Sequence, residues 1–373
     1  FPISPLPHFP ISPFLVQSGV VMKAILLAGG QGSRLRPLTL NTPKPIVPIF
    51  DRPFLRYQIE LLKQVPDIDE IVLSLNYQPK RIEEVFGDGG DLGVTIRYVV
   101  EPNPLGTGGA IKFAAGPKPS GPVVVFNGDV LTSVDLPGVI ALHRERQARA
   151  TIVLTPVDNP SAYGLVEADP DANVKAFLEK PSADQISCNT INAGIYILEG
   201  DTLDRIPPDT AFSIERGYFP SLIEHAETFV AYTYRGYWID IGTREKYQQV
   251  HHDIMSGRFN APPFHEASGT AVISPDARVD PGAVIEGPCF IDAEVVIKSG
   301  ARIGPNSVIG AHCHIGEDAQ VNGAILWPHT WVDRNATLGP LVAGRHCQFG
   351  RHVEVGGSTV LGDNSVVTDF SRL

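Results

Sequence analysis

An aliphatic residue recurs at every sixth position through the C-terminal part of this 373-residue chain. The series runs without a gap through nine positions: Ile273, Val279, Ile285, Ile291, Ile297, Ile303, Ile309, Ile315 and Val321. A period of six is typical of the hexapeptide repeat of a parallel β-helix. In such a fold each six-residue stretch forms one side of a triangular coil, and its aliphatic side chain points into the coil. We therefore predict a left-handed β-helix domain over residues 268–373.

A second series of mostly small residues follows the first at a distance of four positions. Its members are Ala277, Ala283, Cys289, Val295, Ala301, Ser307, Cys313 and Ala319. Small side chains suit the tight corners of the coil. Cys289 and Cys313 belong to this series, so we interpret them as compact core residues. The four cysteines of the chain form no CxxC pair, which argues against a zinc site or a disulfide framework.

The hexapeptide register loosens after about residue 323, around "LWPHTWV", and resumes in "HVEVGGSTVLGDNSVV". A β-helix needs a cap at its ends, and its flat sides are ready surfaces for self-association. We therefore expect a homo-oligomer that assembles through this domain.

The part of the chain from Met22 to about residue 255 alternates between two kinds of segment. Short apolar runs such as "KAILLAG", "EIVLSLN" and "PVVVFNGD" are typical of buried strands, whereas "PFLRYQIELLKQV" is typical of a helix. This alternation predicts a Rossmann-like, mixed but mostly parallel sheet covered by helices, in a domain over residues 22–258. Ligands of such sheets bind at the carboxyl ends of strands, where "LLAGGQGS" and "FNGD" both lie.

Residues 1–21 differ from the rest of the chain. The segment "FPISP" occurs at 1–5 and again at 9–13, and the stretch contains five prolines and no Lys, Arg, Asp or Glu. A secretory signal peptide needs a basic start and an unbroken apolar core, and this stretch has neither. We expect the working protein to begin at Met22 and the leader to be non-native or disordered. A genuine pro-segment is the alternative.

The distribution of charge indicates a local anion site. The chain is acidic, with a formal net charge of −11, which argues against broad binding of nucleic acid through a basic face. Between Met22 and Phe50, however, it carries Lys23, Arg34, Arg36 and Lys44 and no acidic residue. Apolar runs long enough to span a membrane are absent from the sequence, so we expect a cytoplasmic protein without a membrane partner.

The stretch "LLAGGQGSRLRPLT", residues 26–39, has the features of a phosphate-binding loop. Its glycines, Gly29, Gly30 and Gly32, let backbone N–H groups approach phosphate oxygens closely. It lacks the lysine of a P-loop, and Leu35 stands where a dinucleotide fingerprint would have its third glycine. A nicotinamide-dependent dehydrogenase is therefore disfavoured.

Six motifs, in the order in which they occur, resemble the sugar-1-phosphate nucleotidyltransferase (NDP-sugar pyrophosphorylase) family. They are "LLAGGQGSRLRPLTLNTPKP", "FNGD", "YGLVE", "FLEKP", "INAGIY" and "YWIDIGT". Each motif is weak alone, but the ordered set is specific, and with its hexapeptide tail the chain is most similar to the mannose-1-phosphate guanylyltransferase branch. The resemblance implies an enzyme in which a sugar 1-phosphate attacks the α-phosphorus of a nucleoside triphosphate and pyrophosphate leaves. Because many negative charges converge in this reaction, the site needs N–H donors, fixed cations and Mg²⁺.

The resemblance also implies roles for individual residues. The catalytic set comprises Arg34, Lys44, Asp129 and Lys180, and the Mg²⁺ ligands are Asp129 and Asp240. The nucleotide-binding set comprises Leu27, Ala28, Gly29, Gly30, Gly32, Ser33, Glu101, Gly106 and Thr107. The sugar-phosphate set comprises Gly164, Glu179, Lys180 and Asn192, with Tyr163 beside them. The competing interpretations are a surface helix residue for Arg34, turn-forming aspartates for Asp129 and Asp240, and ordinary packing for Tyr163 and Asn192.

The position of Glu101, five residues before Gly106, bears on the base. Pyrimidine-specific members of the family carry a glutamine there, which matches the single N–H of uracil or thymine between its carbonyls. A carboxylate can accept both N1–H and the 2-amino group of guanine, so Glu101 favours GTP. The alternative is that Glu101 is a solvated strand-end residue and that backbone groups read the base. No residue distinguishes mannose from glucose, so thymidylyl, uridylyl or adenylyl transfer to glucose 1-phosphate stays an alternative.

Two other activities compete with this interpretation. A second, acyl-transferring site on the β-helix would use a histidine such as His312, His314 or His329 as its base, but the chain stops soon after "HCQFGRHVEV". A non-catalytic regulatory subunit of the same fold would have lost its charged residues. The charged set listed above is intact, which favours catalysis.

Overall fold

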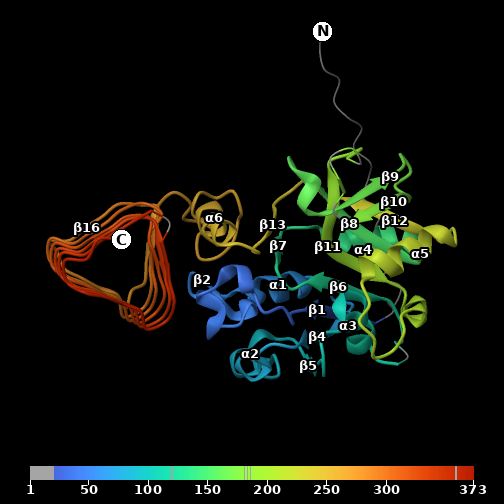
Figure 1. Ribbon diagram of the computed structural model, residues 1–373, viewed down its shortest axis with the longest axis horizontal. Coiled ribbons are helices and arrows are strands. Elements are labelled where there is room, and N and C mark those ends of the chain that lie inside the picture. Colours follow the sequence, from blue (N-terminus) through green and yellow to red (C-terminus); the bar gives the residue numbers. More distant parts are fainter. Residues whose placement is uncertain are drawn as a thin grey trace, which may run out of the picture.

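The molecule has two parts, an α/β body and a triangular coil of strands, with helix α6 (Arg244–Met255) between them (Figure 1). The computed structural model describes residues 21–117, 119, 121–179, 181–182, 184, 186–357 and 359–373. The leader that we expected to be non-native or disordered therefore lies almost wholly outside the described residues. Helix α6 ends at Met255, and the first strand of the coil begins at Ala271.

A mixed sheet forms the centre of the body. Its main path runs β10-β9-β11-β6-β1-β4-β5, and β8 and β12 join through β11. The strands on the glycine-loop side are β1 (Met22–Leu27), β4 (Ile68–Leu75), β5 (Ile96–Val100) and β6 (Val123–Asn127). The others are β8 (Ala150–Pro156), β9 (Gly164–Ala168), β10 (Val174–Glu179), β11 (Thr190–Leu198) and β12 (Phe229–Thr233). The first group is parallel, whereas β11 runs antiparallel to β6, β8 and β9.

Helices cover both faces of this sheet, as the alternating sequence predicts. Alternate residues of β1 point to opposite sides: Ala24 and Leu26 enter one apolar cluster, and Ile25 enters another. The first cluster holds the buried faces of α1 (Phe54–Leu62), α2 (Pro79–Phe86) and α4 (Leu136–Glu145). The second holds those of α3 (Gly106–Ala115) and α5 (Phe219–Glu224). The predicted α/β class is confirmed.

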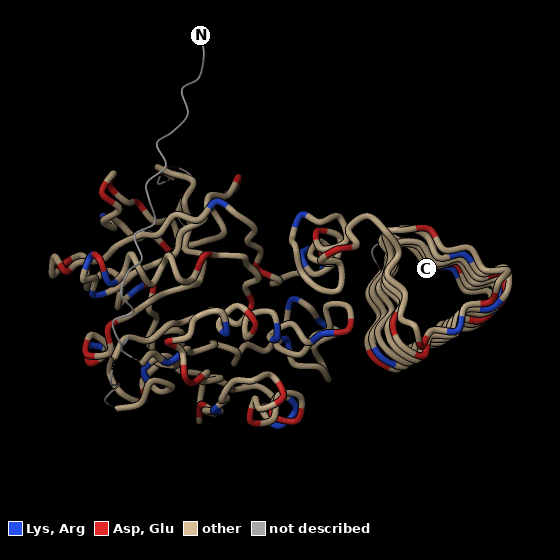
Figure 2. Tube along the Cα trace, turned by 180° about the vertical axis from the view of Figure 1, so that it is seen from behind, with Lys and Arg blue, Asp and Glu red and all other residues tan. Residues whose placement is uncertain are grey.

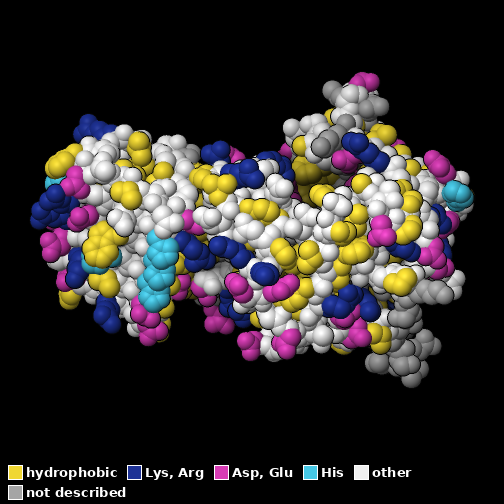
Figure 3. All heavy atoms as spheres, turned by 60° about the horizontal axis from the view of Figure 1, so that its bottom comes forward, with side chains coloured by type: hydrophobic (Ala, Val, Ile, Leu, Met, Phe, Trp, Pro, Cys, Tyr) yellow, Lys and Arg dark blue, Asp and Glu magenta, His cyan; other side chains and the backbone are white. Residues whose placement is uncertain are grey.

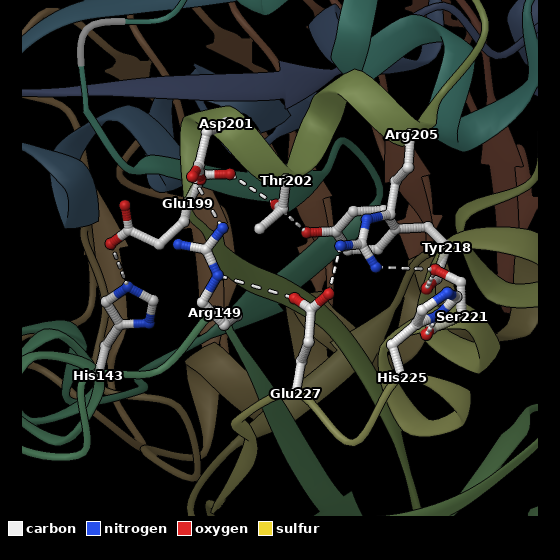
Figure 4. Close-up of polar contacts among 10 residues, drawn as sticks. All are labelled: His143, Arg149, Glu199, Asp201, Thr202, Arg205, Tyr218, Ser221, His225 and Glu227. Carbon is white, nitrogen blue, oxygen red and sulfur yellow. Dashed lines mark hydrogen bonds and ion pairs between the residues drawn. The ribbon is translucent and has the colours of Figure 1, made fainter.

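A network of ion pairs and hydrogen bonds connects the ends of β8, β11 and β12 (Figure 4). Arg149, just before β8, pairs with Asp201 at 2.8 Å and lies 3.7 Å from Glu227, just before β12. Leu198, the last residue of β11, pairs with Val123 at the start of β6. The network therefore lies toward the amino end of β6, away from the end that leads into "FNGD".

The C-terminal part is the predicted left-handed parallel β-helix, built from three sheets. The first contains β14 (Ala271–Ile273), β17 (Cys289–Ile291), β20 (Val308–Ile309), β23 (Ile325–Leu326), β26 (Leu341–Ala343) and β29 (Thr359–Leu361). The second contains β15 (Arg278–Val279), β18 (Val296–Ile297), β21 (His314–Ile315), β24 (Trp331–Val332), β27 (Gln348–Phe349) and β30 (Val366–Val367). The third contains β16 (Val284–Ile285), β19 (Arg302–Ile303), β22 (Gln320–Val321), β25 (Thr337–Leu338) and β28 (Glu354–Val355).

The loosened register has a simple geometric cause. Ile291 pairs with Ile309, 18 positions later, whereas Ile309 pairs with Leu326, only 17 positions later. The next coil is also one residue short, since Leu326 pairs with Ala343. Both missing residues fall at the corner that leads into the first sheet. The inward positions therefore stay aligned although the period of six is broken twice.

An apolar cluster joins the β-helix to the body through α6. Tyr247, Ile254 and Met255 of α6 pack with residues of the first β-helix sheet and with the segment that follows the glycine loop. The buried Trp327 side chain donates from Nε1 to the Tyr247 hydroxyl at 2.9 Å, and that hydroxyl donates to the carbonyl oxygen of Pro48 at 2.5 Å. His251 is also buried there, and burial lowers its pKa to about 4, so it is neutral at physiological pH. Three segments distant in sequence thus share one core.

Charged residues are interspersed over both parts, without a continuous basic stripe in the view of Figure 2. In the described part of the chain, no helix combines the length and the apolar character that crossing a membrane requires.

Replacing Tyr247 with phenylalanine tests the junction. The change leaves the Trp327 N–H and the Pro48 carbonyl without their buried partner, so we expect a loss of about 1–3 kcal/mol in the free energy of unfolding. Tyr98→Phe is the control, because it removes a hydroxyl that donates to the Gly87 carbonyl at the surface. Denaturant unfolding followed by fluorescence measures both. Equal losses in the two variants would contradict the structural role assigned to the junction.

Candidate active site

Two neighbouring parallel strands deliver the glycine loop and Asp129 to the same edge of the sheet. Leu27 at the end of β1 pairs with Asn127 at the end of β6, and the Gly128 N–H donates to the Leu27 carbonyl at 2.9 Å. A side chain on Gly128 would overlap that carbonyl group. Glycine is therefore needed between Asn127 and Asp129, because the two strand ends touch there.

Two adjoining hollows lie along this edge. The larger, of about 440 Å³, is lined by Leu27, Gly29, Gly30, Gln31, Asn76, Glu101, Pro104, Gly106, Thr107 and Ala110. The smaller, of about 220 Å³, is lined by Leu27, Ala28, Gly30, Lys44, Pro45, Thr107, Asn127, Gly128 and Asp129. They share Leu27, Gly30 and Thr107, so they form one continuous trough. The trough brings together most of the residues predicted to bind the nucleotide with two of those predicted to be catalytic.

Glu101 forms a buried wall of the larger hollow and is not a solvated strand-end residue. Only 8% of its surface is exposed. Its Oε1 accepts a hydrogen bond from the Ser74 hydroxyl at 3.1 Å, and its Oε2 accepts one from the Leu105 N–H at 3.0 Å. These two bonds orient the carboxylate, and each oxygen keeps a second lone pair. The wall therefore presents a fixed acceptor pair.

The N-terminus of α3 closes the other side of the larger hollow. Gly106 begins this helix with φ +68°, and a side chain there would lie 2.8 Å from the carbonyl oxygen of Phe212. The Thr107 hydroxyl donates to Glu215 at 2.7 Å and accepts from the Ile214 N–H at 3.0 Å. The Thr107 side chain is thus committed to internal bonds. The first turn of the helix is partly committed as well, because the N–H groups of Gly108 and Gly109 donate to the Phe212 carbonyl at 2.8 and 3.2 Å.

The two aspartates predicted to bind Mg²⁺ lie side by side. Asp240 ends β13 (Trp238–Asp240), which pairs antiparallel with β7 (Val130–Thr132) so that Asp240 lies opposite Val130. The N–H of Ile241 donates to the Asp129 carbonyl at 2.9 Å. Backbone pairing therefore brings together two carboxylates that are far apart in the sequence.

Each of these carboxylates already has a lysine partner. Lys44 Nζ lies 3.0 Å from Asp129 Oδ2, and both residues belong to the predicted catalytic set. Lys246, which the sequence analysis did not identify, contacts Asp240 Oδ1, and its Nζ also donates to the Tyr163 hydroxyl at 2.5 Å. Burial lowers the pKa of Lys246, but the hydrogen bonds to Asp240 and Tyr163 outweigh burial and raise it above its ordinary value. Its signal in the sequence was a basic residue six positions after an aspartate predicted to bind metal.

Arg34 reaches this cluster from the glycine loop. Its side chain is exposed, and a side chain on Gly242 would lie 2.7 Å from Arg34 Nη2. The guanidinium therefore lies against the backbone just after Asp240. Arg34 lines neither hollow, but its position next to the segment after Asp240 is compatible with a phosphate-binding arginine.

Two further residues position the "FNGD" turn and were missed from sequence. The Gln58 side-chain N–H₂ donates to the carbonyls of Asn127 and Val130 at 2.9 and 2.7 Å, so this buried amide spans the turn that carries Asp129. Among the described residues, Asn127 Oδ1 is buried without a hydrogen-bond partner. It lines the smaller hollow, and an unpaired buried acceptor there indicates a place for a ligand donor.

The residues predicted to bind the sugar phosphate lie on β9, β10 and β11. Gly164 pairs with Glu179, and a side chain on Gly164 would lie 2.9 Å from Glu179 Oε2. Asn192 uses both ends of its amide internally, donating to the Tyr196 hydroxyl at 2.8 Å and accepting from the Gly194 N–H at 2.9 Å. Lys180 lies outside the described residues.

These elements adjoin the smaller hollow. A side chain on Gly194 of β11 would lie 2.7 Å from Asn127 Nδ2, and Trp238 of β13 donates to the Ala193 carbonyl at 2.9 Å. Tyr163 packs edge-on against Trp238 with ring centroids 5.7 Å apart. The residues predicted to bind the sugar phosphate therefore lie on strands next to Asp240.

The two carboxylates of Asp129 and Asp240 suit a metal ion that is bound partly by the protein and partly by the substrates of the enzyme. Among the described residues, no group of three or more His, Cys, Asp or Glu side chains could hold a metal ion. Mg²⁺ commonly takes one or two carboxylates together with phosphate oxygens and water. Asp129 and Asp240 fit that pattern.

The histidines of the β-helix are arranged differently from a catalytic group. His312, His329 and His346 stack on one another with successive ring centroids 4.7 Å apart, and histidine side chains form a column in Figure 3. His314 stacks on Trp331 at 3.8 Å. Contacts among the rings explain these residues without an acyl-transfer site.

Comparisons with known proteins identify the family of the chain. The family profile described as "Nucleotidyl transferase" matches residues 23–257, and that of the "GMPPB C-terminal domain" matches residues 285–372. The mannose-1-phosphate guanylyltransferase of Mycobacterium tuberculosis is 39% identical over 71% of this chain and 73% of its own. A UTP-glucose-1-phosphate uridylyltransferase of Synechocystis is 32% identical over 87% and 88%. The crystal structure of HddC from Yersinia pseudotuberculosis matches 62% of this chain and 99% of its own, with TM-score 0.54 and 31% identity.

Alanine substitutions at two glycines of the trough test which of them is needed for packing. Gly128→Ala should force β1 and β6 apart and lower the free energy of unfolding by roughly 1–3 kcal/mol. Gly30→Ala should leave stability unchanged, because no atom lies within 4 Å of the position of the added methyl group. Thermal unfolding of the two variants measures the difference. A stable Gly128→Ala protein would show that the two strand ends are not in the contact described.

Proposed function

The chain belongs to the nucleotidyl transferase family, and from this premise we propose that it converts GTP and mannose 1-phosphate to GDP-mannose and pyrophosphate. The observation that carries the proposal is the trough lined by the glycine loop, the buried Glu101 and the Lys44–Asp129 pair. The Asp240–Lys246 pair lies on the strand beside it. The guanylyltransferase relative supports the same pair of substrates.

The reaction needs positioning and charge neutralisation more than proton transfer. A phosphate monoester is close to a dianion at neutral pH, so its oxygen can attack without a general base. We assign the triphosphate to the glycine loop, where backbone N–H groups, Arg34 and Lys44 would oppose its charge. Asp129 and Asp240 would hold Mg²⁺, which when bound draws the phosphates together and withdraws negative charge.

The sugar phosphate would enter from the β9–β11 side. Gly164 leaves room beside Glu179, whose carboxylate would accept hydrogen bonds from sugar hydroxyls. Lys180 would bind the sugar phosphate, and Asn192 would hold the bend of β11 through its internal bonds. The choice of mannose rests on the relatives, since the uridylyltransferase relative acts on glucose 1-phosphate.

The base assignment rests on Glu101. Its carboxylate is held by Ser74 and Leu105 at the wall of the larger hollow, with lone pairs left for N1–H and the 2-amino group of guanine. Reading of the base by backbone groups is the alternative. A carboxylate would face the O2 and O4 acceptors of uracil unfavourably, which supports GTP over UTP.

Self-association through the β-helix and a cytoplasmic location complete the proposal. Apolar side chains stand exposed on the second sheet, including Trp331 at 49% and Val366 at 62% exposed surface. Contact between two copies would cover such residues.

Glu101→Gln tests the base assignment. The amide should fold normally, because its NH₂ can donate to the Ser74 hydroxyl while its oxygen accepts from Leu105. We expect kcat/KM with GTP to fall about 10- to 100-fold through the loss of one charge-assisted bond, with a smaller effect on UTP and dTTP. Pyrophosphate release over a matrix of nucleoside triphosphates and sugar 1-phosphates measures this. An unchanged order of nucleotide preference would refute the role of Glu101.

Asp129→Asn tests the metal assignment. Removing one of two metal carboxylates should lower kcat/KM roughly 100-fold or more, and a chelator should abolish wild-type activity reversibly. Asp276→Asn, at an exposed position of the β-helix, is the matched control and should behave as wild type. Activity that survives chelation would defeat the assignment.

A further inference from the structure

The two aspartates assigned to the metal are neutralised in different ways. Lys44 comes from the loop that follows the glycine motif, and its side chain is only 10% exposed, so it is packed in place beside Asp129. Lys246 comes from the first turn of α6, and its side chain is 32% exposed. Lys246 can therefore leave Asp240 more easily than Lys44 can leave Asp129, because more of the Lys246 side chain is exposed to solvent and fewer neighbours confine it.

Lys246 occupies one of the two Asp240 oxygens that could bind a metal. Its ammonium group contacts Asp240 Oδ1, and the Tyr163 hydroxyl donates to the same oxygen at 3.0 Å. Mg²⁺ binds carboxylate oxygens at about 2.0–2.1 Å. An ammonium and a divalent ion on one oxygen would repel each other strongly at that separation. The positive charge of Lys246 therefore opposes metal binding at either oxygen of Asp240, and movement of Lys246 away from Asp240 would relieve this repulsion.

Asp240 does not depend on Lys246 for its position. Its backbone is fixed by the pairing of β13 with β7, and its carboxylate keeps the bond from Tyr163. Loss of the lysine would leave the carboxylate in place with one positive neighbour fewer. An ion pair with a purely structural role would be expected to fix a side chain that no other contact fixes, and Asp240 is not such a side chain.

We propose that Lys246 is a resident counter-cation that occupies Asp240 until metal and substrate bind, and that it then transfers to the sugar phosphate. The proposal rests on the nucleotidyl transfer assigned to this site. Tyr163 links Lys246 to the start of β9, where Gly164 faces Glu179, so a released ammonium lies on the sugar-phosphate side of the site. The exchange makes metal binding weak in the empty enzyme and stronger when a phosphate is present to receive Lys246.

The test is the affinity of the protein for Mn²⁺, followed by the electron paramagnetic resonance signal of the free ion. Lys246→Met should bind Mn²⁺ about tenfold more tightly than wild type in the absence of substrates, because one competing charge is gone. Lys246→Arg should stay close to wild type. Mannose 1-phosphate should increase Mn²⁺ affinity in wild type but less in Lys246→Met, and KM for mannose 1-phosphate should rise in the methionine variant while KM for GTP stays within about twofold.

Two controls keep the outcomes distinct. Lys23→Met breaks an ion pair with Glu70 at the opposite end of β1 and should leave Mn²⁺ affinity unchanged. Lys246→Gln provides a second neutral variant should the methionine variant be poorly folded. Unchanged or weaker Mn²⁺ binding in the neutral variants would overturn the proposal about Lys246. If wild type released no pyrophosphate with any sugar 1-phosphate, the proposed function would fail, whatever the Mn²⁺ titration showed.

Discussion

The short antiparallel ladder between β7 and β13 joins the two halves of the site. β7 follows directly from the turn that carries Asp129, and β13 ends at Asp240, so three paired residues place one carboxylate beside the other. Gln58 supports the same turn from α1 through two carbonyl groups. Backbone hydrogen bonds fix positions more firmly than side-chain packing does, because each bond restrains two dihedral angles on either strand. A site that must gather several negative charges depends on such a rigid base.

Helix α6 extends this constraint to the β-helix. It begins four residues after Asp240, and its Lys246 contacts that carboxylate. The next residue of the helix, Tyr247, bonds to Trp327 of the β-helix. One helix therefore contacts both the candidate metal site and the C-terminal coil. The β-helix consequently contributes to the stability of the site through a buried apolar cluster, without supplying any residue to the trough.

The distribution of charge within the site follows from the charge of its ligands. Lys44 and Lys246 each pair with one of the two aspartates, and Arg34 adds a third positive charge next to Gly242. This cluster is therefore slightly positive although the protein as a whole is acidic. Anionic substrates gain more from cations that are already oriented than from cations recruited at binding. In our proposal Lys246 limits metal binding until a phosphate receives it, which would couple the binding of metal and substrate.

Local pattern in the sequence was sufficient for the fold class, the hexapeptide coil and most of the candidate site. The period of six predicts which side chains point into the β-helix. The glycines and aspartates of the candidate site lie at the ends of strands, and the apolar runs in the sequence indicate where those strands end. The sequence predicted a mixed sheet but did not indicate which strands run antiparallel, because strand direction depends on pairing partners and not on the residues of one strand. The broken register in the sequence indicated that the β-helix coils are irregular. Only the structure showed that two coils are each one residue short, and at which corner the residue is missing.

The sequence by itself determined which chemistry the chain can perform, since the order of its motifs and the intact set of charged residues point to nucleotidyl transfer. Only the tertiary structure decided how those residues meet. It showed that Glu101 is buried and held by Ser74 and Leu105, that Gln58 and Asn127 belong to the site, and that Lys246 pairs with Asp240. Such contacts join residues far apart in the chain, and a periodic pattern carries information only about neighbours within a few positions. Pairing between distant segments is set by the packing of the whole fold.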